Sequence, residues 1–60
     1  MTLQEAKQLS KEKGVWFNRP SWHFSIIWSE ELDYFTTHYN CEYISFSPED
    51  ELAEDYTILS

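Results

Sequence analysis

Hydrophobic positions near the start of the chain recur every three residues, which is the spacing of one side of an α-helix. Leu3, Ala6 and Leu9 form this stripe, and the residues between them are polar. Gly14 tolerates the left-handed backbone geometry with which many helices end. The pattern therefore predicts a helix over residues 3–13.

From Val15 onward, helical spacing gives way to alternation, which is typical of β-strands. Phe17 should therefore point away from Trp16, and Pro20 should interrupt the sheet because it lacks a backbone N–H. The next strand should carry Trp22, Phe24, Ile26 and Trp28 on one face. A turn is expected at Ser29–Glu31 and a hairpin turn at Asn40-Cys41. The predicted strands span residues 15–19, 22–28, 32–39, 42–46 and 55–59.

Two pairs of residues indicate where helices begin. Thr2 with Glu5 has the spacing of a capping box, in which each side chain accepts a hydrogen bond from the backbone of the other. Ser47 followed by Pro48 predicts a second helix of one or two turns that ends near Glu54. The predicted fold class is α+β: one domain, residues 1–60, with an N-terminal helix packed on a small antiparallel sheet of four or five strands.

The length of the chain limits its stability. A domain of 60 residues buries only about 60% of the surface that its unfolded chain exposes. Cys41 is the only cysteine, so it excludes an internal disulfide and a zinc site built from several thiolates. Because 42% of the residues are hydrophobic and 18% are aromatic, the chain should fold rather than remain disordered. We therefore expect self-association into a homo-oligomer to support the fold.

Charge is distributed unevenly along the sequence. Residues 1–22 hold all four basic residues with two acids, a net charge of +2, whereas residues 23–60 hold nine acids and no base, a net charge of −9. The total of −7 disfavours direct binding to nucleic acid or to an anionic membrane. No stretch approaches the roughly 18 apolar residues of a membrane helix, and the first residues are too polar for a signal peptide. We expect a cytoplasmic protein.

Residues that often carry chemistry do not form a reactive pattern. His23 and His38 lack the spacing of metal-ligand pairs, and Cys41 lacks the flanking glycines of a nucleophile elbow. With one glycine, the chain has no phosphate-binding loop. Carboxylate pairs such as Glu30 with Asp33 arise readily by chance in so acidic a chain. We therefore predict no catalytic residue, no metal site, no cofactor and no enzymatic activity.

Two other groups of residues suggest binding. Trp16 and Trp22 flank Arg19, so an aromatic plane and a guanidinium could hold a nucleotide base and its phosphate; alternatively, Trp22 belongs to the core. The second group is acidic and could imitate a row of phosphates, or could simply begin a helix on a solubilising surface. It consists of Glu49, Asp50, Glu51, Glu54 and Asp55.

The two ends of the chain resemble the Thoeris anti-defence two-like family, whose members are small proteins of phages and prophages. That family typically opens with an EA-x-x-L helix followed by G-x-x-x-x-R-x-x-W, a spacing that Gly14, Arg19 and Trp22 keep. It typically closes with D-x-x-A-x-D-W and an apolar strand. Asp50, Ala53 and Asp55 keep this second spacing, and Tyr56 stands in place of the tryptophan.

The resemblance implies a phage protein that acts in the cytoplasm of the host bacterium. Members bind cyclic nucleotide or ADP-ribose-derived immune signals, hold them without cleavage, and assemble as homo-oligomers. On this basis the expected ligand-binding residues are Arg19, Trp22, Trp16, Asp55 and Tyr56. The acidic half of the chain favours an alternative function, an inhibitor that binds a host defence, restriction or CRISPR nuclease. A small structural domain with no ligand is a third interpretation.

Overall fold

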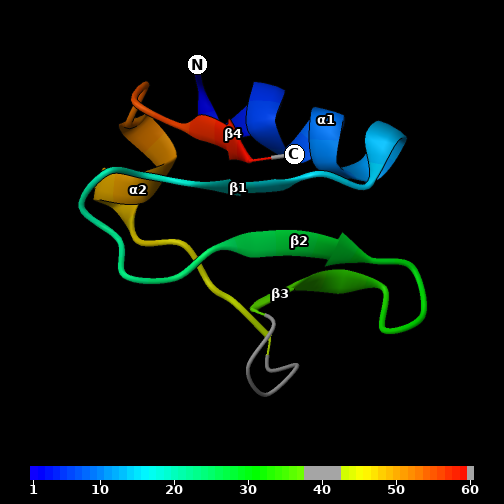
Figure 1. The fold of residues 1–60 in the computed structure, drawn as a ribbon. Helices are drawn as coiled ribbons and strands as arrows, with labels where there is room; N and C mark the ends of the chain where they lie inside the picture. The colour runs from blue at the N-terminus through cyan, green and yellow to red at the C-terminus, as the bar shows by residue number, and fades with distance from the viewer. Residues whose placement is uncertain (38–42, 60) are drawn as a thin grey trace.

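A computed structural model describes residues 1–37 and 43–59 of the chain. Four strands form one sheet in the order β3-β2-β1-β4, and every neighbouring pair is antiparallel. Helix α1 packs against β1 and β2, and α2 lies near one end of the sheet (Figure 1). The α+β class predicted from the sequence is confirmed. The elements are α1 (Leu3–Lys13), β1 (Trp16–Asn18), β2 (Ile26–Ser29), β3 (Tyr34–Thr37), α2 (Pro48–Leu52) and β4 (Thr57–Leu59).

The core lies between α1 and the sheet. Phe17 and Ile26 are paired across β1 and β2, and both are fully buried. The Phe17 ring meets the rings of Phe35 and Tyr56 edge to face, with centroids 5.9 and 6.0 Å apart, an arrangement that aromatic pairs favour. From α1, Leu3 and Ala6 complete this buried cluster. The alternation of β1 is thus confirmed, because Phe17 faces the core and Trp16 does not.

Both helix starts carry the predicted caps. Thr2 with Glu5 and Ser47 with Asp50 each form a reciprocal capping box. Gly14 ends α1 with a φ of 65°, and its N–H donates to the carbonyl of Ser10. These contacts join residues close in sequence, so the sequence pattern was sufficient to predict them.

The second predicted strand begins later than expected. The N–H of Trp22 donates to the carbonyl of Arg19, which marks a tight turn, and regular pairing starts only at Ile26. The Trp22 and Phe24 rings stack with centroids 5.0 Å apart and an angle of 13°. Residues 22–25 lie outside the strands, so the prediction of a strand from residue 22 was wrong.

The prediction of a strand over residues 42–46 was also wrong for its described part. Only Tyr43 forms a bridge, to Thr36, before the chain leaves the sheet towards α2. Leaving the sheet lets the Phe46 ring pack against Phe35 and Trp22. The predicted hairpin turn at Asn40-Cys41 lies outside the described residues.

The last helix and strand are shorter than predicted. Helix α2 ends at Leu52, not near Glu54, because Ala53 adopts an extended conformation with ψ at 148°. Strand β4 begins at Thr57, which pairs with Asn18. In the segment between them, Asp55 pairs with Arg19 and Tyr56 packs into the core.

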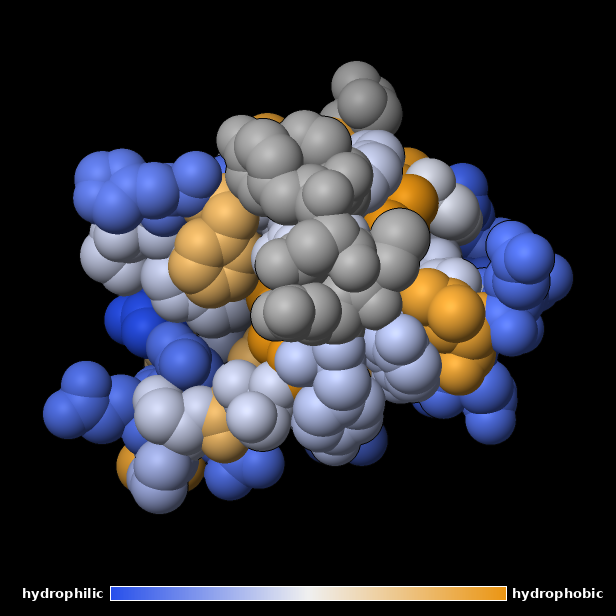
Figure 2. Space-filling model, turned by 90° about the horizontal axis from the view of Figure 1, so that it is seen from below, coloured by the Kyte–Doolittle hydropathy of each residue, from blue (hydrophilic) through white to orange (hydrophobic). Residues whose placement is uncertain are grey.

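The surface mixes hydrophobic and hydrophilic residues on the side of the molecule seen in Figure 2. Exposed large hydrophobic residues include Leu32, at 38%, and Leu52, at 83%. In the part of the chain that the structure describes, the longest helix has 11 residues, and no helix has the length and hydropathy needed to cross a membrane.

Ser10 forms a buried hydrogen bond that the hydrophobic pattern did not indicate. Its side chain is buried, and its hydroxyl accepts a hydrogen bond from the Trp28 N–H at 2.9 Å. The helix is therefore turned so that Ser10 reaches the core, while Leu9 is only half-buried. This bond joins α1 directly to β2.

Replacing Ser10 with alanine should destabilise the protein by about 1–2 kcal/mol. The Trp28 N–H would lose its acceptor, at a cost of about 1–3 kcal/mol, and the better helix propensity of alanine would offset up to about 0.5 kcal/mol. Urea denaturation measures the change. Gln4→Ala, at an exposed position of the same helix, controls for propensity; equal stability of the two variants would contradict the prediction.

Candidate functional site

Arg19 lies between two carboxylates that are distant in sequence. Its Nη1 donates to Asp50 Oδ1 at 2.7 Å, and its Nε donates to Asp55 Oδ1 at 2.8 Å. The side chains of Arg19 and Asp50 are each 21% exposed. The planar guanidinium suits this double pairing. Arg19 therefore joins the end of β1 to α2 and to the segment that leads into β4.

These contacts change the protonation equilibria of all three groups. The hydrogen bonds that Arg19 donates to Asp55 and Asp50 raise the pKa of its guanidinium. Partial burial opposes ionisation of Asp50, but hydrogen bonds from Arg19 and Ser47 outweigh it and lower the pKa of this carboxyl. The pKa of Asp55 is lowered chiefly by its hydrogen bond from Arg19. All three groups are therefore charged at neutral pH.

Tyr56 and Trp22 pack beside this ion pair. The hydroxyl of Tyr56 donates to the backbone carbonyl of Asp50 at 2.7 Å, and burial followed by the charge of Asp50 raises the tyrosine pKa to about 12. Trp22 meets the Tyr56 ring edge to face and stacks on Phe24. Tyr56 thus belongs to the core, and Trp22 covers it.

The structure brings together four of the five residues expected to bind a ligand. Arg19, Trp22, Asp55 and Tyr56 form one cluster, whereas Trp16 points to the opposite face of the sheet. There Trp16 lies opposite Leu59 on β4. Within the cluster, the hydrogen-bonding edge of Arg19 is directed at two carboxylates. As arranged here, it holds the fold together rather than presenting a free cation to a phosphate.

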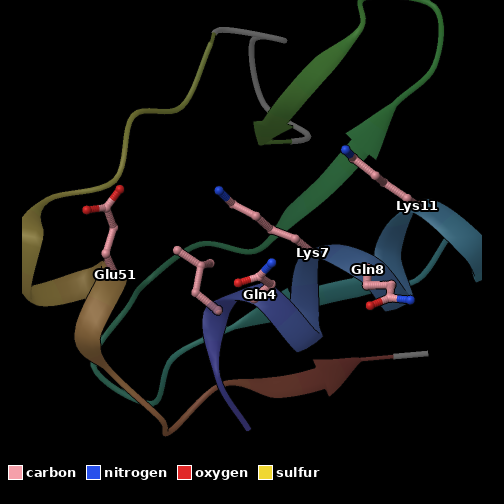
Figure 3. Close-up of a pocket in the computed structure, with 6 residues that line it drawn as sticks. Gln4, Lys7, Gln8, Lys11 and Glu51 are labelled. Carbon is pink, nitrogen blue, oxygen red and sulfur yellow. The ribbon is translucent and has the colours of Figure 1, made fainter.

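A different surface presents free positive charge. Two lysines from successive turns of α1 line a groove with a volume of about 540 Å³ (Figure 3). Small-molecule sites typically measure about 300–1,000 Å³. Leu3 also lines the groove, and Glu51 of α2 stands on the side opposite the lysines. The lining residues are Leu3, Gln4, Lys7, Gln8, Lys11 and Glu51.

The ammonium groups of the two lysines lie over aromatic rings. Lys7 Nζ lies 4.7 Å from the centre of the Phe46 ring, and Lys11 Nζ lies 4.5 Å from that of Trp28. Within residues 1–37 and 43–59, the ion pairs all involve Arg19. Cation–π contact holds an ammonium in place without neutralising its charge. Lys7 and Lys11 therefore remain available to an anion.

The spacing of two lysines in the sequence is a signal for this groove. Lys7 and Lys11 are four residues apart, so a helix places them on one face. What the spacing did not indicate was that aromatic residues from β2, β3 and the segment before α2 would lie beneath that face. Gln4 and Gln8 have the same spacing and line the groove with amide groups, although Gln8 also donates to Glu12.

The acidic group does not form one row of carboxylates. Asp50 and Asp55 are paired with Arg19, whereas Glu49, Glu51 and Glu54 are exposed. Among the described residues, no group of three or more histidine, cysteine, aspartate and glutamate side chains is arranged to hold a metal ion. His23 is exposed. His38 and Cys41 lie outside the described residues.

Comparisons of the chain with protein-family models, with curated proteins and with solved structures gave no match. The resemblance of its two ends to the Thoeris anti-defence two-like family therefore remains a prediction from the sequence. Arg19 and Asp55, two of the residues that carry this resemblance, are in contact in the fold.

Acid should remove the contribution of Arg19 to stability. Both carboxyl groups have lowered pKa values in the folded protein, so their contribution is complete above the unfolded pKa of about 3.9 and is lost as the pH falls through the lower folded values. Arg19→Gln should be less stable than the native protein at pH 7, and the difference should shrink between about pH 4 and pH 2.

Denaturation at a series of pH values measures this difference. Lys13→Gln, which removes an exposed charge that has no ion-pair partner among the described residues, is the control, and its effect should not follow the same acid profile. A stability difference for Arg19→Gln that is as large at pH 2 as at pH 7 would refute the role of the two carboxylates.

Proposed function

We propose that this protein binds an anionic nucleotide and holds it without chemical conversion. The observation that carries the proposal is the pair of lysines in the groove on α1. Lys7 and Lys11 present two ammonium groups without ion-pair partners among the described residues, beside a hollow of about 540 Å³. Ammonium groups are good partners for phosphate oxygens. Gln4 supplies an amide that can donate to or accept from a base.

The biological role that we propose is that of a phage anti-defence protein. It would sequester a cyclic nucleotide or ADP-ribose-derived immune signal in the cytoplasm of the host bacterium. Support comes from the family-like motifs at the two ends of the chain and from the lysine groove. The proposed phosphate partners therefore change from Arg19 to Lys7 and Lys11, because the guanidinium is already paired. The total charge of −7 opposes anion binding, but salt screens charges beyond roughly 8–10 Å.

A protein-binding inhibitor of a host nuclease is the second candidate function. The turn after β2 favours it, because Glu30, Glu31 and Asp33 are all exposed there. They give this turn a negative surface that a basic enzyme could contact. Affinity capture from host lysate separates the two functions. Retention of a basic nuclease that salt releases would favour inhibition; a nucleotide released by heat denaturation would favour sequestration.

The expected self-association has a candidate surface on the outer face of the sheet. Trp16 and Ile27 line a hollow there together with Leu32, which is 38% exposed. We propose that a second copy of the chain covers this face, because the domain is too small to build a large core of its own. Sheets that bury one face in this way pack about 10 Å apart.

Loss of either groove lysine should weaken nucleotide binding. Lys7→Gln and Lys11→Gln each remove one charge-assisted partner of the phosphate, and each should raise the Kd for a bound cyclic nucleotide roughly tenfold. Calorimetry against a panel of cyclic nucleotides at several salt concentrations measures this. Lys13→Gln makes the same charge change on the same helix outside the groove and should alter the Kd less than about twofold. Absence of binding to every member of the panel would reject the proposal.

Charge on the outer face of the sheet should disrupt the proposed oligomer. Leu32→Lys places an ammonium in the apolar hollow and should weaken self-association roughly tenfold or more. Sedimentation at decreasing protein concentration measures the effect. Leu52→Lys, at an 83% exposed position on α2 that does not line the hollow, is the matched control. A native protein that sediments as a folded monomer throughout would count against the interface.

A further inference from the structure

The groove on α1 has walls of opposite charge. Lys7 and Lys11 stand on one wall, whereas Glu51 rises from α2 on the other (Figure 3). Glu51 is exposed, and no hydrogen bond or ion pair of its carboxylate occurs among the described residues. Its backbone N–H is fixed by the carbonyl of Ser47 at 3.0 Å. A negative group therefore lies at the edge of the site proposed for an anion.

Helix α2 is anchored firmly enough to keep Glu51 there. The neighbouring Asp50 pairs with Arg19, caps the helix through Ser47, and accepts from the Tyr56 hydroxyl through its backbone carbonyl. Three separate contacts thus fix the residue next to Glu51. The backbone of α2 therefore places the Glu51 carboxylate on one side of the groove.

The two walls favour different parts of a ligand. A carboxylate accepts hydrogen bonds and donates none, so Glu51 suits the hydroxyl groups of a sugar or the amino group of a base. It repels phosphate oxygens, whereas the lysines attract them. A ligand that carries one anionic group on one side and hydrogen-bond donors on the other satisfies both walls. A chain of phosphates satisfies only the lysines.

We infer that Glu51 is a specificity residue, which selects a nucleotide with a single phosphate charge and rejects polyphosphates. Of the two proposed ligand classes, it therefore favours a cyclic nucleotide with one phosphate over an ADP-ribose-derived signal, which carries two. This inference rests on the proposed function, because it concerns the same groove. It adds the class of nucleotide and assigns a role in nucleotide binding to a residue that the predicted ligand-binding residues did not include.

The test compares two probes, cyclic AMP and inorganic tripolyphosphate, by calorimetry on the native protein and on Glu51→Gln. The substitution keeps the size of the side chain and removes its charge. Glu51→Gln should shift the ratio of the two Kd values in favour of tripolyphosphate by roughly tenfold. Glu49→Gln, on the first turn of the same helix outside the groove, makes the same change of charge and should shift the ratio less than about twofold.

Three outcomes separate the inference from the proposed function. A shift towards tripolyphosphate in Glu51→Gln alone supports the inference. Binding of both probes that depends on Lys7 and Lys11, with an unchanged ratio in Glu51→Gln, overturns the inference and leaves the proposed function standing. Binding of neither probe by the native protein overturns the inference, and absence of binding to the whole panel of cyclic nucleotides overturns the proposed function as well. Thermal melting of each variant verifies that the fold is retained.

Discussion

The double ion pair of Arg19 is the contact on which the arrangement of the C-terminal half depends. One guanidinium holds Asp50 of α2 and Asp55 of the following segment, which lie 31 and 36 residues away in the chain. Because α2 is only five residues long, its own hydrogen bonds cannot maintain it. Arg19 and Tyr56 therefore hold α2 beside α1. The groove lies between the two helices, and α2 forms one of its walls.

The same contact determines where positive charge remains free. Of the four basic residues, Arg19 is neutralised by its two partners, so the three lysines of α1 supply the available cations. Lys7 and Lys11 lie over aromatic rings and have no ion-pair partner among the described residues. A chain with a net charge of −7 thus keeps one local cationic surface, with Glu51 on its far side. This separation of charge is the physical basis of the proposed nucleotide site.

The aromatic residues have three different roles that their number alone does not distinguish. Phe17, Phe35 and Tyr56 form the buried core through edge-to-face contacts. Phe46 and Trp28 lie at its margin, where they support the lysines of the groove. Trp16 lies on the outer face of the sheet, which no described helix covers. A small domain can use aromatic residues in this way because each ring buries a large area at a low cost in side-chain entropy.

The sequence by itself determined the elements whose causes are local. Helix α1 follows from its hydrophobic spacing and from caps at both ends, and the α+β class follows from the change of period at Val15. The family-like motifs at the two ends of the chain also included Arg19, Trp22 and Asp55, and these residues do lie together in the fold. Only the tertiary structure decided that Arg19 pairs with acids, that Trp16 turns away from it, and that the strand after Pro20 starts at Ile26. Those outcomes depend on contacts between residues far apart in the chain, and no local period or cap encodes which distant groups will meet.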